Sequence, residues 1–434
     1  MMDIVAIVGR PNVGKSTLFN RLIGTKQSIV DDQSGVTRDR QYGESTWNGK
    51  DFAVVDTGGF VRGSDDIFEA AIRLQVEIAI DEAAVIIFMV DVATGLTDLD
   101  EAVARMLRKT NKPVMLVVNK VDNHSRLLEA NEFWSLGFEH THFLSSVTGS
   151  GTGDMLDAVV EYIENREEEP KEIPQIAIVG QPNAGKSSFI NALLGEERNI
   201  VTDIAGTTRD TTSSHYNKFD REFDLIDTAG IRKKAKVYEN LEFYSVMRAI
   251  KAIEKADVVV LMIDAADGIE SQDLAIFRIA QRRNKGIVIA VNKWDLIENK
   301  ETNTARDYEQ TVREKFAPFN DLPVIFMSVL EKQRIMKVVD ATMQVYESRT
   351  RRIPTSRLNE VMQKAMERYA PPSYRGREVS IKYVTQLPIA YPAFAFYCNH
   401  PQHIQDSYKN YLENKIRENF DFTGVPISIF FRKK

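Results

Sequence analysis

Cysteine is nearly absent from this 434-residue chain, in which Cys398 is the single example, so an internal disulfide framework is excluded. No apolar run approaches the roughly 18 residues that a membrane-spanning helix needs. The longest run, residues 83–90, has the length of a strand. The N-terminal segment MMDIVAIVGRPNVGKS lacks the basic region, long apolar core and cleavage site of a signal peptide. These absences predict a cytoplasmic protein that does not enter a membrane.

Neither sign of charge dominates the chain. Its net charge is −6, and this charge is unevenly distributed. Residues 351–434 carry a net charge of +7, and the remainder carries −13. A basic tail on an acidic body favours contact with a polyanion, and a solvated basic surface is the equally weighted alternative. Hydrophobic residues make up 43% of the chain and charged residues 27%, as in ordinary globular domains.

Three sequence segments occur twice, in the same order. GRPNVGKST at 9–17 returns as GQPNAGKSS at 180–188, DTGG at 56–59 returns as DTAG at 227–230, and NKVD at 119–122 returns as NKWD at 292–295. The first two pairs are offset by 171 residues and the third by 173. Repetition over such a distance indicates a duplicated domain rather than a solenoid of short repeats.

Each copy alternates short apolar runs with stretches of helical periodicity. The runs cover residues 4–8, 52–56, 85–90 and 114–119 in the first copy, and 175–179, 223–227, 258–263 and 286–292 in the second. Continuous apolar strands separated by helices predict an α/β fold with a mainly parallel sheet covered on both faces. We expect one domain at 1–165, an exposed acidic linker at 166–174, and a second domain at 175–350.

Residues 351–434 have a different pattern and form a third predicted domain. Helical periodicity at 356–369 and 405–420 is combined with strand patterns at 378–385, 393–398 and 426–431. The resulting α-β-β-α-β order predicts a small α+β domain.

The first repeated segment fits a phosphate-binding P-loop, because it lies between a strand and a helix in both copies. Its glycines let backbone N–H groups surround phosphate oxygens, and the following helix adds its dipole. Lys15 and Lys186 are expected at the β- and γ-phosphates, and the hydroxyls of Ser16 and Ser187 at Mg²⁺. The expected binding residues are Gly9, Asn12, Gly14, Lys15, Ser16, Thr17, Gly180, Asn183, Gly185, Lys186, Ser187 and Ser188.

The second segment places Asp56 and Asp227 at strand ends, where a carboxylate on the Mg²⁺ side is needed. Gly59 and Gly230 follow, and a backbone N–H group at such a position can sense the γ-phosphate. In isolation such a segment is equally well an ordinary strand-to-turn connection. Its distance behind a P-loop favours the Mg²⁺ interpretation.

The third segment predicts guanine specificity. The carboxylates of Asp122 and Asp295 can accept both N1–H and N2–H₂ of guanine, whereas adenine offers no such pair of donors. The asparagine side chains and lysine stems are expected to pack around the base, at Asn119, Lys120, Asn292 and Lys293. Ser145 and Ser328 follow later apolar runs and are expected on the loop beside the base.

Two threonines, Thr37 and Thr208, are also 171 residues apart. In a switch loop such a threonine completes the Mg²⁺ shell only when a γ-phosphate is present, and a loop-capping role is the alternative. We assign catalysis to these two threonines together with the P-loop lysines, Lys15 and Lys186, and the DTxG glycines, Gly59 and Gly230. The predicted Mg²⁺ ligands are Ser16, Thr37, Asp56, Ser187, Thr208 and Asp227.

The ordered motifs, their duplication and the basic tail resemble the Der (EngA) family of bacterial tandem GTPases over essentially the whole chain. The resemblance implies a KH-like C-terminal domain, binding to the large ribosomal subunit and a role in its late assembly. Residues 351–434 contain no GxxG, only the separate Gly376 and Gly424. Because a KH domain clamps four nucleotides with that loop, the tail is expected either to pack on its own GTPase domains or to contact RNA phosphates.

The chain differs from Ras-like GTPases at the residue that follows DxxG. Ras-like GTPases have a glutamine there, which orients the attacking water. This chain has Phe60 and Ile231 there, and neither side chain can hydrogen-bond water. Both sites are therefore expected to be slow alone. Asn12 and Asn183 occupy the position with which related bacterial GTPases hold K⁺, and stabilisation of the loop is the alternative.

These patterns predict an enzyme that binds and hydrolyses GTP to GDP and phosphate at two Mg²⁺-dependent sites. It would act as a nucleotide-switched monomer in assembly of the large ribosomal subunit, with the subunit or its precursor and rRNA as partners. The alternative is a nucleotide-gated binding scaffold with one slow or inactive module. A GTPase of membranes or tRNA modification is less favoured, since the chain lacks a lipid-anchor motif and a second catalytic cluster.

Overall fold

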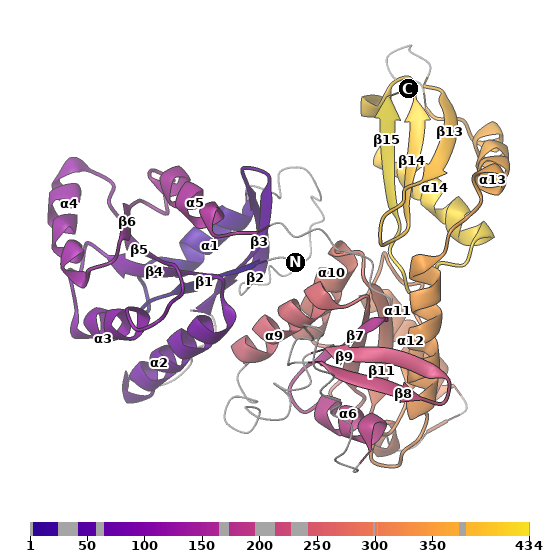
Figure 1. The fold of residues 1–434 in the computed structure, drawn as a ribbon, viewed down its shortest axis with the longest axis horizontal. Coiled ribbons are helices and arrows are strands. Elements are labelled where there is room, and N and C mark those ends of the chain that lie inside the picture. Colours follow the sequence, from indigo (N-terminus) through magenta and orange to yellow (C-terminus); the bar gives the residue numbers. More distant parts are fainter. Residues whose placement is uncertain are drawn as a thin grey trace, which may run out of the picture. The chain divides into compact units, whose positions relative to one another are not determined.

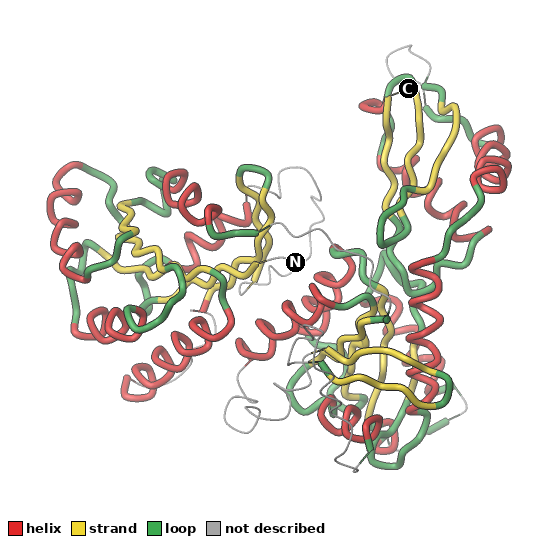
Figure 2. Tube along the Cα trace, viewed as in Figure 1, coloured by secondary structure: helices red, strands yellow, loops and turns green. Residues whose placement is uncertain are grey.

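The computed structural model describes residues 3–24, 42–57, 65–164, 173–195, 213–226, 242–297, 300–301, 303–372 and 379–433. The chain divides into two compact units. The first consists of residues 1–167 and 241–248, and the second of residues 168–240 and 249–434. Figure 1 identifies the elements along the chain, and Figure 2 distinguishes helices from strands.

The first unit contains a six-stranded sheet with the order β2-β3-β1-β4-β5-β6, parallel except for the antiparallel pair β2–β3. Its strands are β1 (Asp3–Val8), β2 (Tyr42–Trp47), β3 (Lys50–Asp56), β4 (Val85–Asp91), β5 (Val114–Asn119) and β6 (His140–Phe143). Its helices are α1 (Lys15–Gly24), α2 (Asp65–Glu82), α3 (Asp98–Leu107), α4 (His124–Glu129), α5 (Thr152–Glu161) and the 3₁₀ helix η2 (Ala130–Leu136). Every residue of β4 and β5 is buried, as expected for strands covered on both faces.

The second unit begins with the same topology, since its strands follow the order β8-β9-β7-β10-β11-β12 with only β8–β9 antiparallel. The strands are β7 (Gln175–Gly180), β8 (Ser214–Lys218), β9 (Arg221–Ile226), β10 (Val258–Asp264), β11 (Gly286–Asn292) and β12 (Val324–Phe326). The helices are α6 (Lys186–Leu194), α10 (Ser271–Arg282), α11 (Thr304–Lys315), α12 (Ile335–Thr350) and the 3₁₀ helix η3 (Trp294–Leu296). Helix α9 (Glu242–Lys255) belongs to this unit from residue 249 onward. The predicted duplication of a mainly parallel α/β fold is confirmed.

The tail has the predicted α-β-β-α-β order. It comprises α13 (Thr355–Arg368), β13 (Ile381–Gln386), β14 (Ala393–Cys398), the 3₁₀ helix η4 (Pro401–His403), α14 (Asp406–Asn419) and β15 (Ser428–Lys433). The sheet order is β13-β14-β15, with β13–β14 antiparallel and β14–β15 parallel. Phe394 and Phe396 of β14 share a buried core with Leu358 of α13 and Leu412 of α14. Both helices therefore contribute to one core with the sheet.

The tail is bound to the second module through main-chain hydrogen bonds. Ile287 of β11 donates from its backbone nitrogen to the Gly424 carbonyl over 2.7 Å, and the Gly424 nitrogen donates to the Asp321 carbonyl over 2.8 Å. The neighbouring Val425 is fully buried in the hydrophobic core of the second module. Contact between the tail and the preceding α/β module, one of the two expected roles, is thus present in the structure.

Candidate nucleotide-binding sites

Each P-loop approaches the end of an interior strand, β5 or β11, so closely that it requires glycine. Gly14 has φ +102°, and a Cβ atom there would lie 2.2 Å from the side-chain nitrogen of Asn119. Gly185 repeats the arrangement with φ +98° and 2.2 Å to the side-chain nitrogen of Asn292. Both loops therefore curl inward at the carboxyl ends of the strands, which is the shape that presents N–H groups to a phosphate.

The P-loop lysines lie inside these loops. Lys15 Nζ donates to the carbonyl oxygens of Gly9 and Arg10 over 2.7 and 2.8 Å. Lys186 Nζ does the same with Gly180 and Gln181, over 3.0 and 2.5 Å. Burial lowers the pKa of Lys15 to about 8, although the charge of nearby Asp56 opposes the shift. A buried ammonium of this kind gains strongly from a phosphate partner.

Two predicted Mg²⁺ ligands meet in the first module. Ser16, in the first turn of α1, donates its hydroxyl to Asp56 Oδ2 at the end of β3 over 2.6 Å. Asp56 is fully buried. A hydroxyl and a carboxylate that converge beside a P-loop fit the oxygen preference of Mg²⁺. The corresponding Asp227 of the second module lies outside the described residues, whereas Ser187 lies in the first turn of α6, as Ser16 does in α1.

The asparagines of the NKxD segments connect two loops instead of facing outward. Asn119 Nδ2 donates to the Val13 carbonyl over 2.7 Å, and Asn119 Oδ1 accepts from the backbone nitrogen and the hydroxyl of Ser146, each over 2.9 Å. In the second module Asn292 links the Ala184 carbonyl, at 2.8 Å, with the Val329 nitrogen, at 3.1 Å. Each asparagine thus fixes the P-loop relative to the loop expected beside the base.

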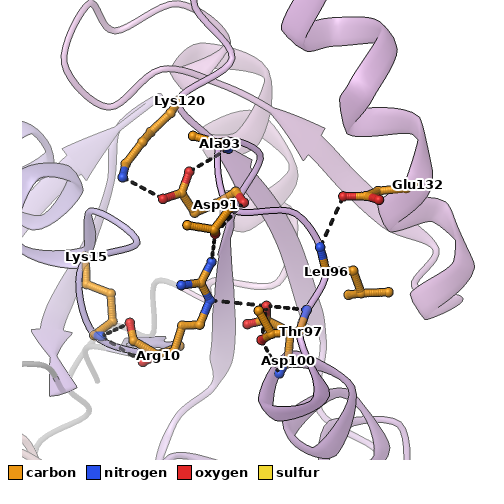
Figure 3. Close-up of polar contacts among 11 residues, drawn as sticks. Arg10, Lys15, Asp91, Ala93, Leu96, Thr97, Asp100, Lys120 and Glu132 are labelled. Atoms are coloured by element: carbon orange, nitrogen blue, oxygen red, sulfur yellow. Dashed lines mark hydrogen bonds and ion pairs between the residues drawn. The ribbon is translucent and has the colours of Figure 1, made fainter.

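The NKxD lysines have carboxylate partners that the sequence reasoning missed. Lys120 Nζ lies 2.5 Å from Asp91 Oδ2, and Lys293 Nζ lies 2.5 Å from Asp264 Oδ2. Figure 3 shows Lys120 and Asp91 together at this edge of the sheet. Both lysines adopt positive φ, +67° and +59°, which directs the chain from strand to loop. The available signal was an aspartate at the end of an apolar strand, the same signal that identified Asp56.

The predicted guanine acceptors are accessible. The Asp122 side chain is 47% exposed and lies 3.3 Å from Arg126 Nη1, and Asp295 is also exposed. Ser145 and Ser328 lie on the expected loops but are buried. Their hydroxyl oxygens accept from the backbone nitrogens of Thr148 and Glu331, over 3.4 and 3.1 Å. These serines therefore shape the loops that are expected beside the base.

The remaining P-loop residues are arranged alike in the two modules. Asn12 and Asn183 are exposed with φ +65° and +64°, a conformation that asparagine tolerates better than most residues. Thr17 and Ser188 are exposed in the first turns of α1 and α6. Five predicted site residues lie outside the described part of the chain: Thr37, Gly59, Thr208, Asp227 and Gly230.

Comparison with known proteins agrees with this duplicated architecture. Residues 4–120 and 175–293 match the family described as 50S ribosome-binding GTPase, and residues 352–432 match the KH-domain-like C-terminal domain of EngA bacterial GTPase enzymes. GTPase Der of Christiangramia forsetii is 59% identical over the full length of both chains. The chain belongs to the Der (EngA) family of GTPases. GTPase Der of Flavobacterium johnsoniae is 58% identical over 100% of this chain and 99% of its own.

Family membership makes the chain a GTP-binding enzyme, a GTPase with two GTPase domains and a KH-like domain. Among solved structures, Aquifex aeolicus Era bound to GDP and AlF₄⁻ is 27% identical over 45% of this chain and 69% of Era, with a TM-score of 0.31. Within the described residues, the structure has no helix that combines the length and hydrophobicity needed to cross a membrane.

Proposed function

We propose that the chain hydrolyses GTP at both predicted sites and acts as a nucleotide-switched factor in assembly of the large ribosomal subunit. The observation that carries the first part is the matched geometry of the two modules. Each has a lysine held inside the P-loop and a buried asparagine between the P-loop and the base-side loop. A module that had lost nucleotide binding would have no reason to keep both.

In this proposal the protein residues act by position and charge. Lys15 and Lys186 would bind the β- and γ-phosphates, and Asp122 and Asp295 would bind the guanine edge. Ser16 and Asp56 would hold Mg²⁺, with Ser187 and Asp227 as their counterparts, and the ion would neutralise charge between the β- and γ-phosphates. Thr37 and Thr208 would close the switch loops.

Separate inactivation of the sites tests two-site hydrolysis. Lys15→Ala and Lys186→Ala should each reduce GTP turnover, and the double variant should lose it. The matched controls are Lys109→Ala and Lys337→Ala, which remove exposed lysines from the same two modules. If one P-loop variant turned over GTP at the parent rate, the alternative of a scaffold with one inactive module would replace the proposal.

Binding to the ribosome is supported by the matched 50S ribosome-binding GTPase family and by the net charge of +7 in residues 351–434. Co-sedimentation with large ribosomal subunits should be compared in GTP, a non-hydrolysable analogue, GDP and no nucleotide. Pelleting only with GTP or the analogue supports a nucleotide switch.

The variant Asp122→Asn/Asp295→Asn should pellet with a xanthosine triphosphate analogue rather than the guanosine one, because an amide changes the base edge accepted. Absence of pelleting in every state would remove the ribosome from the proposal.

A further inference from the structure

In both modules the residue after the first P-loop glycine contacts a helix. That helix follows the strand beside the one that leads into the P-loop. In the first module Arg10 Nε donates to Asp100 Oδ2 over 3.2 Å, and its guanidinium also contacts the Thr94 hydroxyl. Asp100 lies in the first turn of α3 and is only 1% exposed. Figure 3 shows Arg10 directed from the P-loop toward Asp100 and Thr97.

The second module makes the same connection with different chemistry. Gln181 Nε2 donates to Asp273 Oδ2 over 2.8 Å, and Asp273 in the first turn of α10 is also 1% exposed. We call these two interactions, Arg10–Asp100 and Gln181–Asp273, the P-loop tethers. The first is an ion pair, and the second joins a neutral amide to a carboxylate.

Helix capping alone does not account for these aspartates. Asp100 does accept from the Thr97 backbone nitrogen over 3.2 Å, and Asp273 from that of Glu270 over 3.1 Å. Capping carboxylates are normally solvated, yet Oδ1 of both aspartates is buried without a hydrogen bond among the described residues. Both modules therefore have a buried aspartate with an unsatisfied oxygen atom, and in both modules this aspartate contacts the P-loop.

The electrostatic surroundings of the two tethers differ. Arg10 supplies a positive charge beside Asp100, whereas Gln181 supplies none, and Glu270 of the second module replaces the neutral Thr97. Burial raises the pKa of both aspartates, and that of Asp273 reaches about 6. The charge of Arg10 opposes the rise at Asp100, whereas the charge of Glu270 adds to it at Asp273. Although the second contact is shorter, at 2.8 Å against 3.2 Å, its neutral donor leads us to expect the weaker tether.

The tethered residues also hold the P-loop lysines. Lys15 Nζ donates to the Arg10 carbonyl over 2.8 Å, and Lys186 Nζ donates to the Gln181 carbonyl over 2.5 Å. The tether that holds Arg10 or Gln181 therefore also fixes the carbonyl oxygen that accepts from the P-loop lysine. It also fixes the start of the loop whose N–H groups would surround the β-phosphate.

We infer that Arg10 and Gln181 are positioning residues, which set each P-loop for the β-phosphate by tethering it to Asp100 or Asp273, and that Arg10 does so more strongly. The inference rests on the proposed nucleotide sites. A GMP ligand lacks the β-phosphate, so the ratio of GDP to GMP affinity measures this function separately from recognition of the base.

The experiment uses the full chain with one site silenced. Asp295→Asn removes the guanine acceptor of the second site, so fluorescent GDP and competing GMP report on the first. Arg10→Gln should weaken GDP binding about tenfold and GMP binding less than about twofold, as expected when an ion pair is replaced by the amide–carboxylate contact of the second module. Arg10→Lys should recover part of the loss, because the charge remains while the fork geometry does not.

Asp100→Asn should weaken GDP binding similarly, and the double variant Arg10→Gln/Asp100→Asn should bind GDP no more weakly than the poorer single variant.

The second module provides the reciprocal test. In an Asp122→Asn chain, Gln181→Arg should strengthen GDP binding several-fold and raise the GDP-to-GMP ratio. Unchanged GDP affinity in Arg10→Gln and Asp100→Asn would overturn the inference. Equal losses for GDP and GMP, together with a lower unfolding midpoint, would also overturn it and leave a purely structural pair. If the Asp295→Asn parent bound no GDP, the proposed first site itself would fail, a result separable from the other two.

Discussion

Asn119 and Val13 lie 106 residues apart in the chain, yet the Asn119 side chain donates a 2.7 Å hydrogen bond to the Val13 carbonyl. The bond is buried, and it joins the end of β5 to the middle of the P-loop. The same bond joins Asn292 to Ala184 over 2.8 Å. In both modules a buried hydrogen bond therefore connects the P-loop to the NKxD segment, which we propose to bind the phosphates and the base.

Replacing Asn119 should reveal this connection. Asn119→Ala leaves the Val13 carbonyl and the Ser146 nitrogen buried without this partner, at a cost of about 1–3 kcal/mol for each unsatisfied group. We expect GDP affinity in an Asp295→Asn chain to fall at least about tenfold. Asn111→Ala is the control, because Asn111 is an exposed asparagine in the turn before β5. Equal affinities for the two variants would contradict the role of Asn119.

Binding of GDP at the first site should weaken in alkaline solution. Lys15 has a pKa lowered to about 8, mainly by burial, and a phosphate partner raises it again. Binding therefore takes up a proton once the free lysine is neutral. Affinity should be constant below about pH 7 and decline above about pH 8, by up to tenfold per pH unit. Titrations in the Asp295→Asn chain test this. GMP, which shares the base, should show a shallower decline, and parallel curves for both nucleotides would reject the assignment to Lys15.

Potassium should accelerate turnover if Asn12 and Asn183 hold that ion. The sequence has Phe60 and Ile231 where a water-orienting glutamine would lie, so a monovalent cation is the proposed source of additional positive charge. GTP turnover in KCl should exceed turnover in NaCl of equal ionic strength by about tenfold or more. Asn12→Ala and Asn183→Ala should remove the difference, one site at a time. Equal rates in the two salts would mean that the asparagines only stabilise a left-handed loop.

The attachment of the KH-like domain should depend on Gly424. Gly424 has φ +75°, and a Cβ atom there would lie 2.6 Å from Val345 Cγ2 and 2.9 Å from the Ile287 carbonyl oxygen. Gly268 has the same φ, but a Cβ atom added there would meet nothing within 4 Å, so Gly268→Ala is a matched control. We expect Gly268→Ala to lower the free energy of unfolding by about 1–2 kcal/mol through its backbone conformation alone. Gly424→Ala should lower it by about 1–3 kcal/mol more through overpacking.

Urea unfolding monitored by Trp294 fluorescence measures this difference. Trp294 lies in the second compact unit, and replacement of Trp47 and Trp134 by Phe leaves it as the sole tryptophan. Equal free energies of unfolding for the two alanine variants would show that the Gly424 contact with β11 contributes nothing to stability.

Local pattern was sufficient for much of this protein. The buried parallel strands were found because both of their faces are covered, so their sequences are continuously apolar, as in residues 85–90. The antiparallel strand β8, with the sequence SHYNK, was missed because an edge strand mixes polar and apolar residues. Pro174, the last residue of the predicted linker, is buried, and its carbonyl accepts from the Asp224 backbone nitrogen at 2.9 Å.

The sequence by itself determined the duplication, the P-loops and the guanine motifs, because those functions need particular residue types at fixed spacing. Tertiary structure decided which side chains meet across the sheet. Lys120 with Asp91, Asn119 with Val13 and Arg10 with Asp100 are far apart in the chain, and no local pattern specifies such pairs. They form because parallel strands bring their carboxyl ends to one edge, where the loops that follow them pack together.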